Sequence, residues 1–119
     1  MQSHWDMEYP SVDNIETAIE KFSEIKGIEI QLTEIDMHNT DDSDEGLKAQ
    51  AARYKEIFTM LKNMDKKGAN ITNVTFWGLQ DDVTWLSSFK GEESFPLLFD
   101  ADGKAKPVYN SLMEVAKAK

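Results

Sequence analysis

The 119-residue sequence contains no cysteine, which excludes disulfide bonds and cysteine-ligated metal sites. No apolar run approaches the roughly 18 to 20 residues that cross a bilayer, so a membrane-spanning helix is not expected. Basic residues are also few, because 13 Lys and Arg stand against 22 Asp and Glu and give a net charge of −9. Nucleic acids and anionic membranes need clustered basic side chains, so neither is expected as a partner. A neutral ligand is compatible with this charge.

Apolar residues at helical spacing predict three helices. The first covers residues 12–25, where Asp13 and Glu16 fit a capping box. The second covers about 46–64 and ends at Lys66, Lys67 and Gly68. The last begins near Pro107, a residue suited to a first helical turn, and buries Val108, Leu112 and Val115.

Strands are predicted between these helices. Residues 1–9 fit the end of a strand that enters a loop, and branched residues predict further strands over 28–35 and 71–79. A long irregular segment, 80–105, follows, and loops of this length are usually functional. Strands that alternate with helices imply parallel strands and right-handed crossovers, so the predicted fold class is α/β. Three strands cannot shield both faces of a parallel sheet, so we expect a piece of a larger fold.

The stretch 27–38, GIEIQLTEIDMH, ends in the carboxylates Glu34 and Asp36 followed by His38, where an α/β fold places chemistry. Its alternation conflicts with the expected faces, because Ile30 and Leu32 share the parity of Glu34. This predicts a bulge or an edge position for part of the strand. In the chain alone, exposure of the barrel-facing side of three strands is also expected to leave aliphatic side chains such as Ile30 and Leu32 wet. His38 is a weak candidate that fits a surface or supporting position better than a catalytic one. The acidic run 39–45 is typical of a solvated loop and lacks the spacing of a calcium site.

Four motifs in order carry a resemblance to a known family: MQSHW, QLTEIDMH, TFWGLQDDVTWL and PLLFDADGKAKPVY. Together they resemble the C-terminal part of family 10 glycoside hydrolases, the endo-β-1,4-xylanases. The resemblance covers nearly the whole chain and implies a (β/α)8 TIM barrel with its site at the carboxyl ends of the strands. Residues 1–119 would form one partial barrel domain of about three βα units, strands six to eight.

The resemblance also implies roles for six residues. Glu34 matches the nucleophile, His4 the histidine that hydrogen-bonds it, and Asp36 the aspartate behind that histidine. The matches for substrate contact are Gln2, Trp77 and Trp85, the two tryptophans as flat faces for sugar rings. A solvated glutamate and core tryptophans are the alternatives that the stretches alone leave open. Trp5 has no implied role and fits a loop aromatic. Neither a cofactor nor a metal site is implied.

The family's acid/base glutamate belongs to an earlier strand with no counterpart in the sequence. The implied function is therefore a portion of a retaining endo-1,4-β-xylanase that hydrolyses internal β-1,4-xylosidic bonds of xylan, and that is inactive without the missing strands. Two alternatives are a non-catalytic partial barrel that binds xylo-oligosaccharides and a module that assembles through exposed sheet edges. Expected partners are xylan or xylo-oligosaccharides, and either an N-terminal barrel segment or a second copy that completes the barrel. A polymeric substrate implies an extracellular or cell-surface location.

Overall fold

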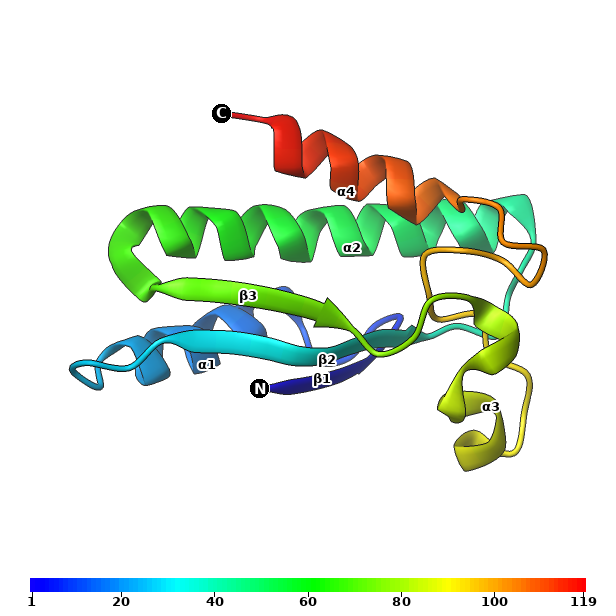
Figure 1. Ribbon diagram of the computed structural model, residues 1–119, viewed down its shortest axis with the longest axis horizontal. Helices are drawn as coiled ribbons and strands as arrows, with labels where there is room; N and C mark the ends of the chain where they lie inside the picture. Colours follow the sequence, from blue (N-terminus) through cyan, green and yellow to red (C-terminus); the bar gives the residue numbers. More distant parts are fainter.

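The computed structural model describes residues 1–119 and contains a three-stranded sheet with four α-helices (Figure 1). Its elements in chain order are β1 (Gln2–Asp6), α1 (Val12–Ser23), β2 (Ile30–His38), α2 (Asp44–Met64), β3 (Ile71–Phe76), α3 (Trp85–Lys90) and α4 (Pro107–Lys117). The strands lie in the order β1-β2-β3 and all pairs are parallel. The α/β architecture predicted from the sequence is therefore confirmed.

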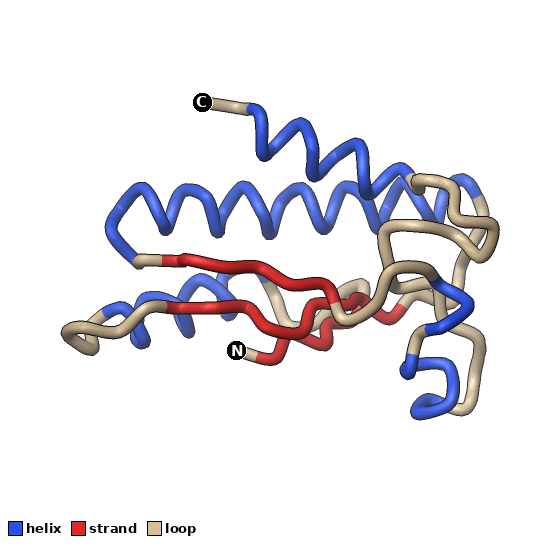
Figure 2. Tube along the Cα trace, in the orientation of Figure 1, coloured by secondary structure: helices blue, strands red, loops and turns tan.

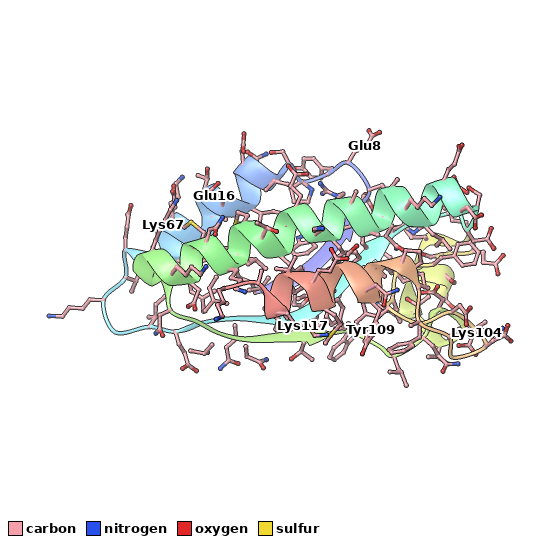
Figure 3. All side chains as sticks on the ribbon, turned by 90° about the horizontal axis from the view of Figure 1, so that it is seen from above. Glu8, Glu16, Lys67, Lys104, Tyr109 and Lys117 are labelled. Carbon is pink, nitrogen blue, oxygen red and sulfur yellow. The ribbon has the colours of Figure 1, made fainter.

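The helices pack on one face of this sheet. Figure 3 shows α2 running between α1 and α4, and α2 contacts both. The core lies beneath them and joins residues of β1, β2, α1 and α2, with Ile19, Leu32, Tyr54 and Ile57 fully buried. The opposite face of the sheet carries no helix across its middle, whereas both faces of a parallel sheet are normally covered. No helix combines the length and the apolar character that a membrane span requires.

Hydroxyl side chains cap three of the helices, among them Thr84 at the start of α3. Ser11 caps α1, because its Oγ accepts the backbone N–H of Asn14 at 3.1 Å, so the predicted capping box of Asp13 and Glu16 is wrong. Ser43 caps α2 in the same way. Helix α1 ends at Ser23, two residues before the predicted end. At the other end of the chain α4 begins with Pro107, as predicted.

A bulge in β2 resolves the conflict of faces that its alternation presents. The pairing of β2 with β3 is irregular between Leu32 and Ile35. Ile30 and Leu32 before the bulge, and Ile35 and Met37 after it, are all buried under the helices. Because the extra residue shifts the alternation, Glu34 and Asp36 lie on the other face. The predicted bulge is confirmed, and the prediction that Ile30 and Leu32 would be wet is wrong.

The segment between β3 and α4 is more ordered than predicted. Within 80–105 the chain forms a short 3₁₀ turn, Asp81–Val83, and then α3. Figure 2 shows α3 at the carboxyl end of the strands, followed by a long connection to α4. Its backbone is tied to that end of the sheet, since Met37 and Phe95 donate to the carbonyls of Pro96 and Asn39. The segment therefore closes one end of the sheet.

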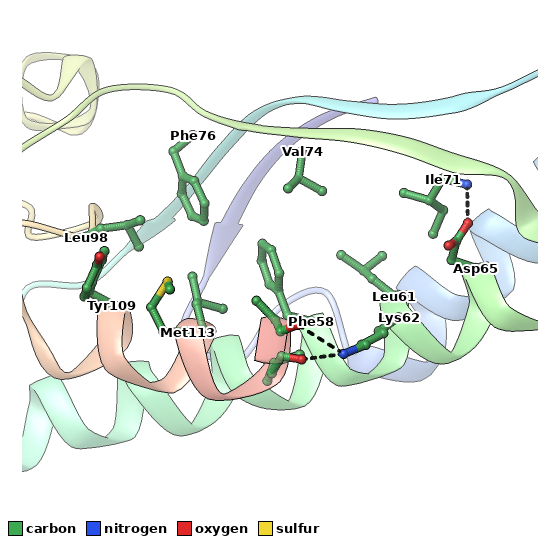
Figure 4. Close-up of a pocket in the computed structure, with 13 residues that line it drawn as sticks. Phe58, Leu61, Lys62, Asp65, Ile71, Val74, Phe76, Leu98, Tyr109 and Met113 are labelled. Carbon is green, nitrogen blue, oxygen red and sulfur yellow. Dashed lines mark hydrogen bonds between the residues drawn. The ribbon is translucent and has the colours of Figure 1, made fainter. Parts of the chain in front are cut away.

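An apolar groove of about 380 Å³ runs beside β3, between α2 and α4 (Figure 4). Phe76 and Val74 of β3 line one wall, and Phe58, Leu112 and Met113 line the other. The rings of Phe58 and Phe76 stack with their centroids 5.8 Å apart. β3 is an edge strand, so the groove lies along an open edge of the sheet.

Candidate active site

The register of β1 and β2 brings the predicted polar residues together. In this parallel pair Gln2 lies beside Glu34, and His4 lies beside Asp36. The intervening residues Ser3 and Ile35 are buried under the helices. Because side chains alternate along a strand, the polar residues all project from the face without helices. Residues 30 or more positions apart in the chain thus form one cluster.

His4 bridges the two carboxylates. Its Nδ1 lies 2.8 Å from Oδ1 of Asp36, and its Nε2 lies 3.1 Å from Oε2 of Glu34. An ionised carboxylate only accepts hydrogen bonds, so two ionised partners require a hydrogen on each ring nitrogen. In that state the imidazolium is paired with two negative charges and its ring plane is fixed by both.

Trp85 completes the cluster from the first position of α3. Its indole Nε1–H donates to Oδ2 of Asp36 at 2.9 Å, and its ring meets His4 edge to face at a centroid distance of 5.0 Å. The side chain of Asp36 is fully buried, and its two oxygens each have a partner, whereas 20% of the Glu34 side chain is exposed. Of the two carboxylates, only Glu34 can meet a ligand.

Trp77 follows β3 on the same face as this cluster. Phe76 packs under the helices against Tyr54 and Phe58, so the next residue projects to the other side. The backbone N–H of Trp77 donates to the carbonyl of Ile35, and the side chain is 47% exposed. Gly78 has a φ of 136°, and a Cβ there would lie 2.7 Å from Leu97. The core alternative for Trp77 is thereby excluded.

The other aromatic and polar candidates take different positions. Gln2 is exposed beside Glu34 at the sheet face, where a ligand could reach it. Trp5 lies within β1 and is buried in the core, so its interpretation as a loop aromatic is wrong. His38 contacts Ser94 and Glu92 in the segment after α3 and takes no part in the His4 cluster. Its predicted supporting position agrees with this geometry.

Sequence reasoning missed a buried ion pair in the connection between β3 and α4. Nζ of Lys106 lies 2.8 Å from Oδ2 of Asp81 and also donates to the carbonyls of Phe95 and Leu97. Burial raises the pKa of Asp81 and lowers the pKa of Lys106, while the ion pair opposes both changes. The Asp and Lys are 25 residues apart and have no periodic pattern, so only a structure reveals the pair.

The chain has no group of three or more His, Cys, Asp or Glu side chains arranged to hold a metal ion. The apolar groove beside β3 lies under α4, on the other face of the sheet from His4 and Glu34. The chemistry available at the cluster is therefore that of one accessible carboxylate, one histidine and flat indole faces.

Comparison with known proteins gives this cluster a context. The model of glycosyl hydrolase family 10 matches residues 1–115. The chain belongs to this family. Endo-1,4-beta-xylanase B of Butyrivibrio fibrisolvens is 44% identical over 117 residues, which cover 98% of this chain and 18% of the relative. The endo-1,4-beta-xylanase of Geobacillus stearothermophilus is 38% identical over 121 residues, which cover 92% of this chain and 36% of the relative.

Solved structures of family 10 share the fold. A family 10 protein of Paenibacillus barcinonensis superposes with a TM-score of 0.87 at 37% identity, over 99% of this chain and 36% of that chain. A mutant of an intracellular xylanase of Thermoanaerobacterium saccharolyticum, solved with xylotetraose, superposes with a TM-score of 0.82 at 41% identity. The match covers 94% of this chain and 32% of that chain. The chain thus corresponds to about a third of these family 10 structures, and its three parallel strands form part of a TIM barrel.

Proposed function

We propose that these residues form the nucleophile-bearing part of a retaining endo-1,4-β-xylanase. The observation that carries this proposal is the bridge of His4 between the exposed Glu34 and the buried Asp36. A retaining glycosidase needs one ionised carboxylate held in a fixed orientation beside the anomeric carbon. His4 supplies that orientation, and its second bond to Asp36 holds the ring in place.

In this mechanism Glu34 attacks the anomeric carbon and displaces the departing sugar oxygen, which gives a covalent glycosyl-enzyme. A second carboxyl group protonates the departing oxygen and then activates the water that cleaves the intermediate. We propose that this acid/base group comes from a segment of the barrel outside residues 1–119. Asp36 is unsuited to either role, because it is fully buried with both oxygens bonded.

We propose Gln2, Trp77 and Trp85 as substrate contacts. The two indoles are 47% and 36% exposed on the carboxylate side of the sheet, and such rings stack on pyranose faces. The Thermoanaerobacterium relative was solved with xylotetraose, which supports a xylo-oligosaccharide as the ligand. If the acid/base group is never supplied, the same surface would only bind sugar, and that is the second candidate function.

The apolar groove favours assembly of a complete barrel. Its lining of Phe76, Val74 and Leu112 lies along the open edge of β3, where another strand can pair. We propose that the occupant is an N-terminal barrel segment, which would also bring the acid/base group. Self-association of two copies is the other route by which the edge could be covered. An extracellular or cell-surface location stays a prediction, since one structural relative is described as intracellular.

The decisive experiment measures hydrolysis of an aryl β-xylobioside by the chain alone and mixed with strands one to five of a family 10 barrel. Activity only in the mixture is expected. Glu34→Gln should reduce the rate of the mixture by orders of magnitude without changing assembly, because the amide is a poor nucleophile. The control is Glu29→Gln, an exposed glutamate at the start of the same stretch. A Glu34→Gln mixture that keeps most of the rate would disprove the nucleophile assignment.

A further inference from the structure

His38 makes contacts that the proposed chemistry does not use. Its Nδ1 lies 2.8 Å from Oγ of Ser94, and its Nε2 lies 3.0 Å from Oε1 of Glu92. The imidazole is 13% exposed and Ser94 is buried. Both ring nitrogens are therefore occupied by the segment that follows α3.

Both partners match the hydrogen-bonding capacity of the imidazole. The carboxylate of Glu92 only accepts, so Nε2 carries the hydrogen, and the hydroxyl of Ser94 can either accept from Nδ1 or donate to it. With both nitrogens bonded and little of the ring exposed, His38 has no free atom for a substrate. Its contribution must act through the segment that it holds.

That segment, residues 85–94, is fastened to β2 at both ends. At its start, Trp85 donates to Asp36, and at its end Glu92 and Ser94 meet His38. Asp36 and His38 are two residues apart on one strand and share a face. The backbone N–H of Ser94 also bonds Oγ of Ser87, so the far end of the segment is tied back into α3.

We infer that His38 is a positioning residue that holds segment 85–94 against the end of β2 and thereby sets Trp85 over Asp36 and His4. Among side-chain hydrogen bonds and ion pairs, one other joins the end of α3 to the strands, a 3.7 Å ion pair between Lys90 and Asp6, both partly exposed, and the backbone N–H of Phe95 donates to the carbonyl of Asn39 just beyond the segment. Exposed ion pairs of this kind hold little. The effect on sugar binding rests on the proposed function, whereas the effect on the position of Trp85 does not.

Hydrogen exchange of the Trp85 indole N–H tests this inference in the chain itself. With ¹⁵N-labelled tryptophan the chain gives three indole signals, and Trp85→Phe identifies the one from Trp85. His38→Ala should speed exchange of that N–H by about tenfold or more, the factor expected when two hydrogen bonds that limit local opening are lost. The buried indole of Trp5 should exchange at an unchanged rate.

Conservative variants separate positioning from general packing. His38→Asn places an amide near Nδ1, so it can keep the Ser94 contact and should restore part of the protection. Glu92→Ala should speed exchange of the Trp85 N–H, whereas Glu93→Ala, an exposed neighbour, should not. If His38→Ala fails to fold, the comparison of Glu92→Ala with Glu93→Ala decides.

Titration with xylotriose distinguishes this inference from the proposed function. If wild type binds and His38→Ala binds more weakly with faster exchange, both stand. If wild type does not bind xylotriose but the Trp85 N–H still exchanges faster in His38→Ala, the positioning role stands and the assignment of sugar binding fails. Unchanged exchange of the Trp85 N–H in folded His38→Ala, or equal effects of Glu92→Ala and Glu93→Ala, would overturn the inference.

Discussion

Asp36 is the most enclosed member of the site, although it faces away from the core. His4 and Trp85 cover it and each satisfies one of its oxygens. A buried carboxylate without such partners would be strongly unfavourable, so the three side chains depend on one another. At the scale of single residues, the orientation of Glu34 is thus set by a carboxylate that no ligand touches.

Asp36→Asn should lower the free energy of unfolding by about 1 to 3 kcal/mol. An amide oxygen can still accept from Trp85, but the amide NH2 can bond His4 only where Nδ1 carries no hydrogen, so the charge-assisted bond between His4 and a buried carboxylate is replaced by a weaker neutral one. Urea unfolding monitored by circular dichroism would measure the loss. Asp42→Asn, at an exposed aspartate with no side-chain hydrogen bond, is the matched control. Equal stabilities of the two variants would show that the network contributes nothing.

The residues of the cluster could be predicted from the sequence, but not all of their contacts. His4, Glu34 and Asp36 stand in the motifs that resemble the family, and the structure brings all three together. The bond from Trp85 to Asp36 could not be predicted, because it joins positions 49 apart. It depends on where α3 lies, and a six-residue helix has too few turns for a periodic signal.

At the scale of elements, the periodic helices were predictable and their ends were less so. Helices over 12–25 and 46–64 and the start at Pro107 all have counterparts in α1, α2 and α4. The cap at Ser11 was missed because a hydroxyl there competes with Asp13 for the same role, and the sequence does not choose between them. The bulge in β2 was detectable because its alternation conflicts with burial.

The connection from β3 to α4 is held together by the ion pair of Asp81 and Lys106. It joins the 3₁₀ turn, the loop at residues 95–97 and the residue before α4. Lys106→Met should lower the free energy of unfolding at pH 7 by about 3 to 5 kcal/mol, because Asp81 is left buried without its cation. The double variant with Asp81→Asn should recover part of this loss.

The loss in Lys106→Met should also depend on pH. Burial already raises the pKa of Asp81, and removal of the cation raises it further. A raised folded-state pKa means that the folded chain binds the proton more tightly, so the contribution of Asp81 to stability falls as the pH rises through that pKa. The difference in the free energy of unfolding between wild type and Lys106→Met should therefore shrink in acid. Urea titrations at several pH values measure it, and a constant difference would contradict the assignment.

At the scale of the whole molecule, the sheet has helices on one face, an open edge at β3 and an apolar groove beside that edge. Such features were expected from a chain with only three predicted strands. The location of the groove was not predictable from the sequence. Groove residues such as Phe58 and Leu112 lie on the apolar faces of helices, and the sequence does not show which part of such a face packs on the sheet and which part stays open. Residues 1–119 match about a third of the length of the two family 10 structures compared above.

Val74→Lys should block assembly with strands one to five of a family 10 barrel while the chain itself stays folded. Val74 lines the groove but is already partly exposed, so a lysine can point to water in the free chain and would be buried in the assembly. Light scattering of the mixture measures its mass. Ala52→Lys, at an exposed position of α2 outside the groove, is the control. Normal assembly of Val74→Lys would show that another surface joins the two parts.

The bulge in β2 makes the direction of the two carboxylates depend on one surplus residue. Thr33 is exposed, so many substitutions there should be tolerated. Deleting Thr33 would place Glu34 directly after Leu32, and regular alternation would then keep Glu34 and Asp36 on the face away from the helices. In a library of variants, position 33 should therefore accept both replacements and its own deletion, whereas deletion of the buried Ile35 should be rejected, because it turns Glu34 or Asp36 toward the helices.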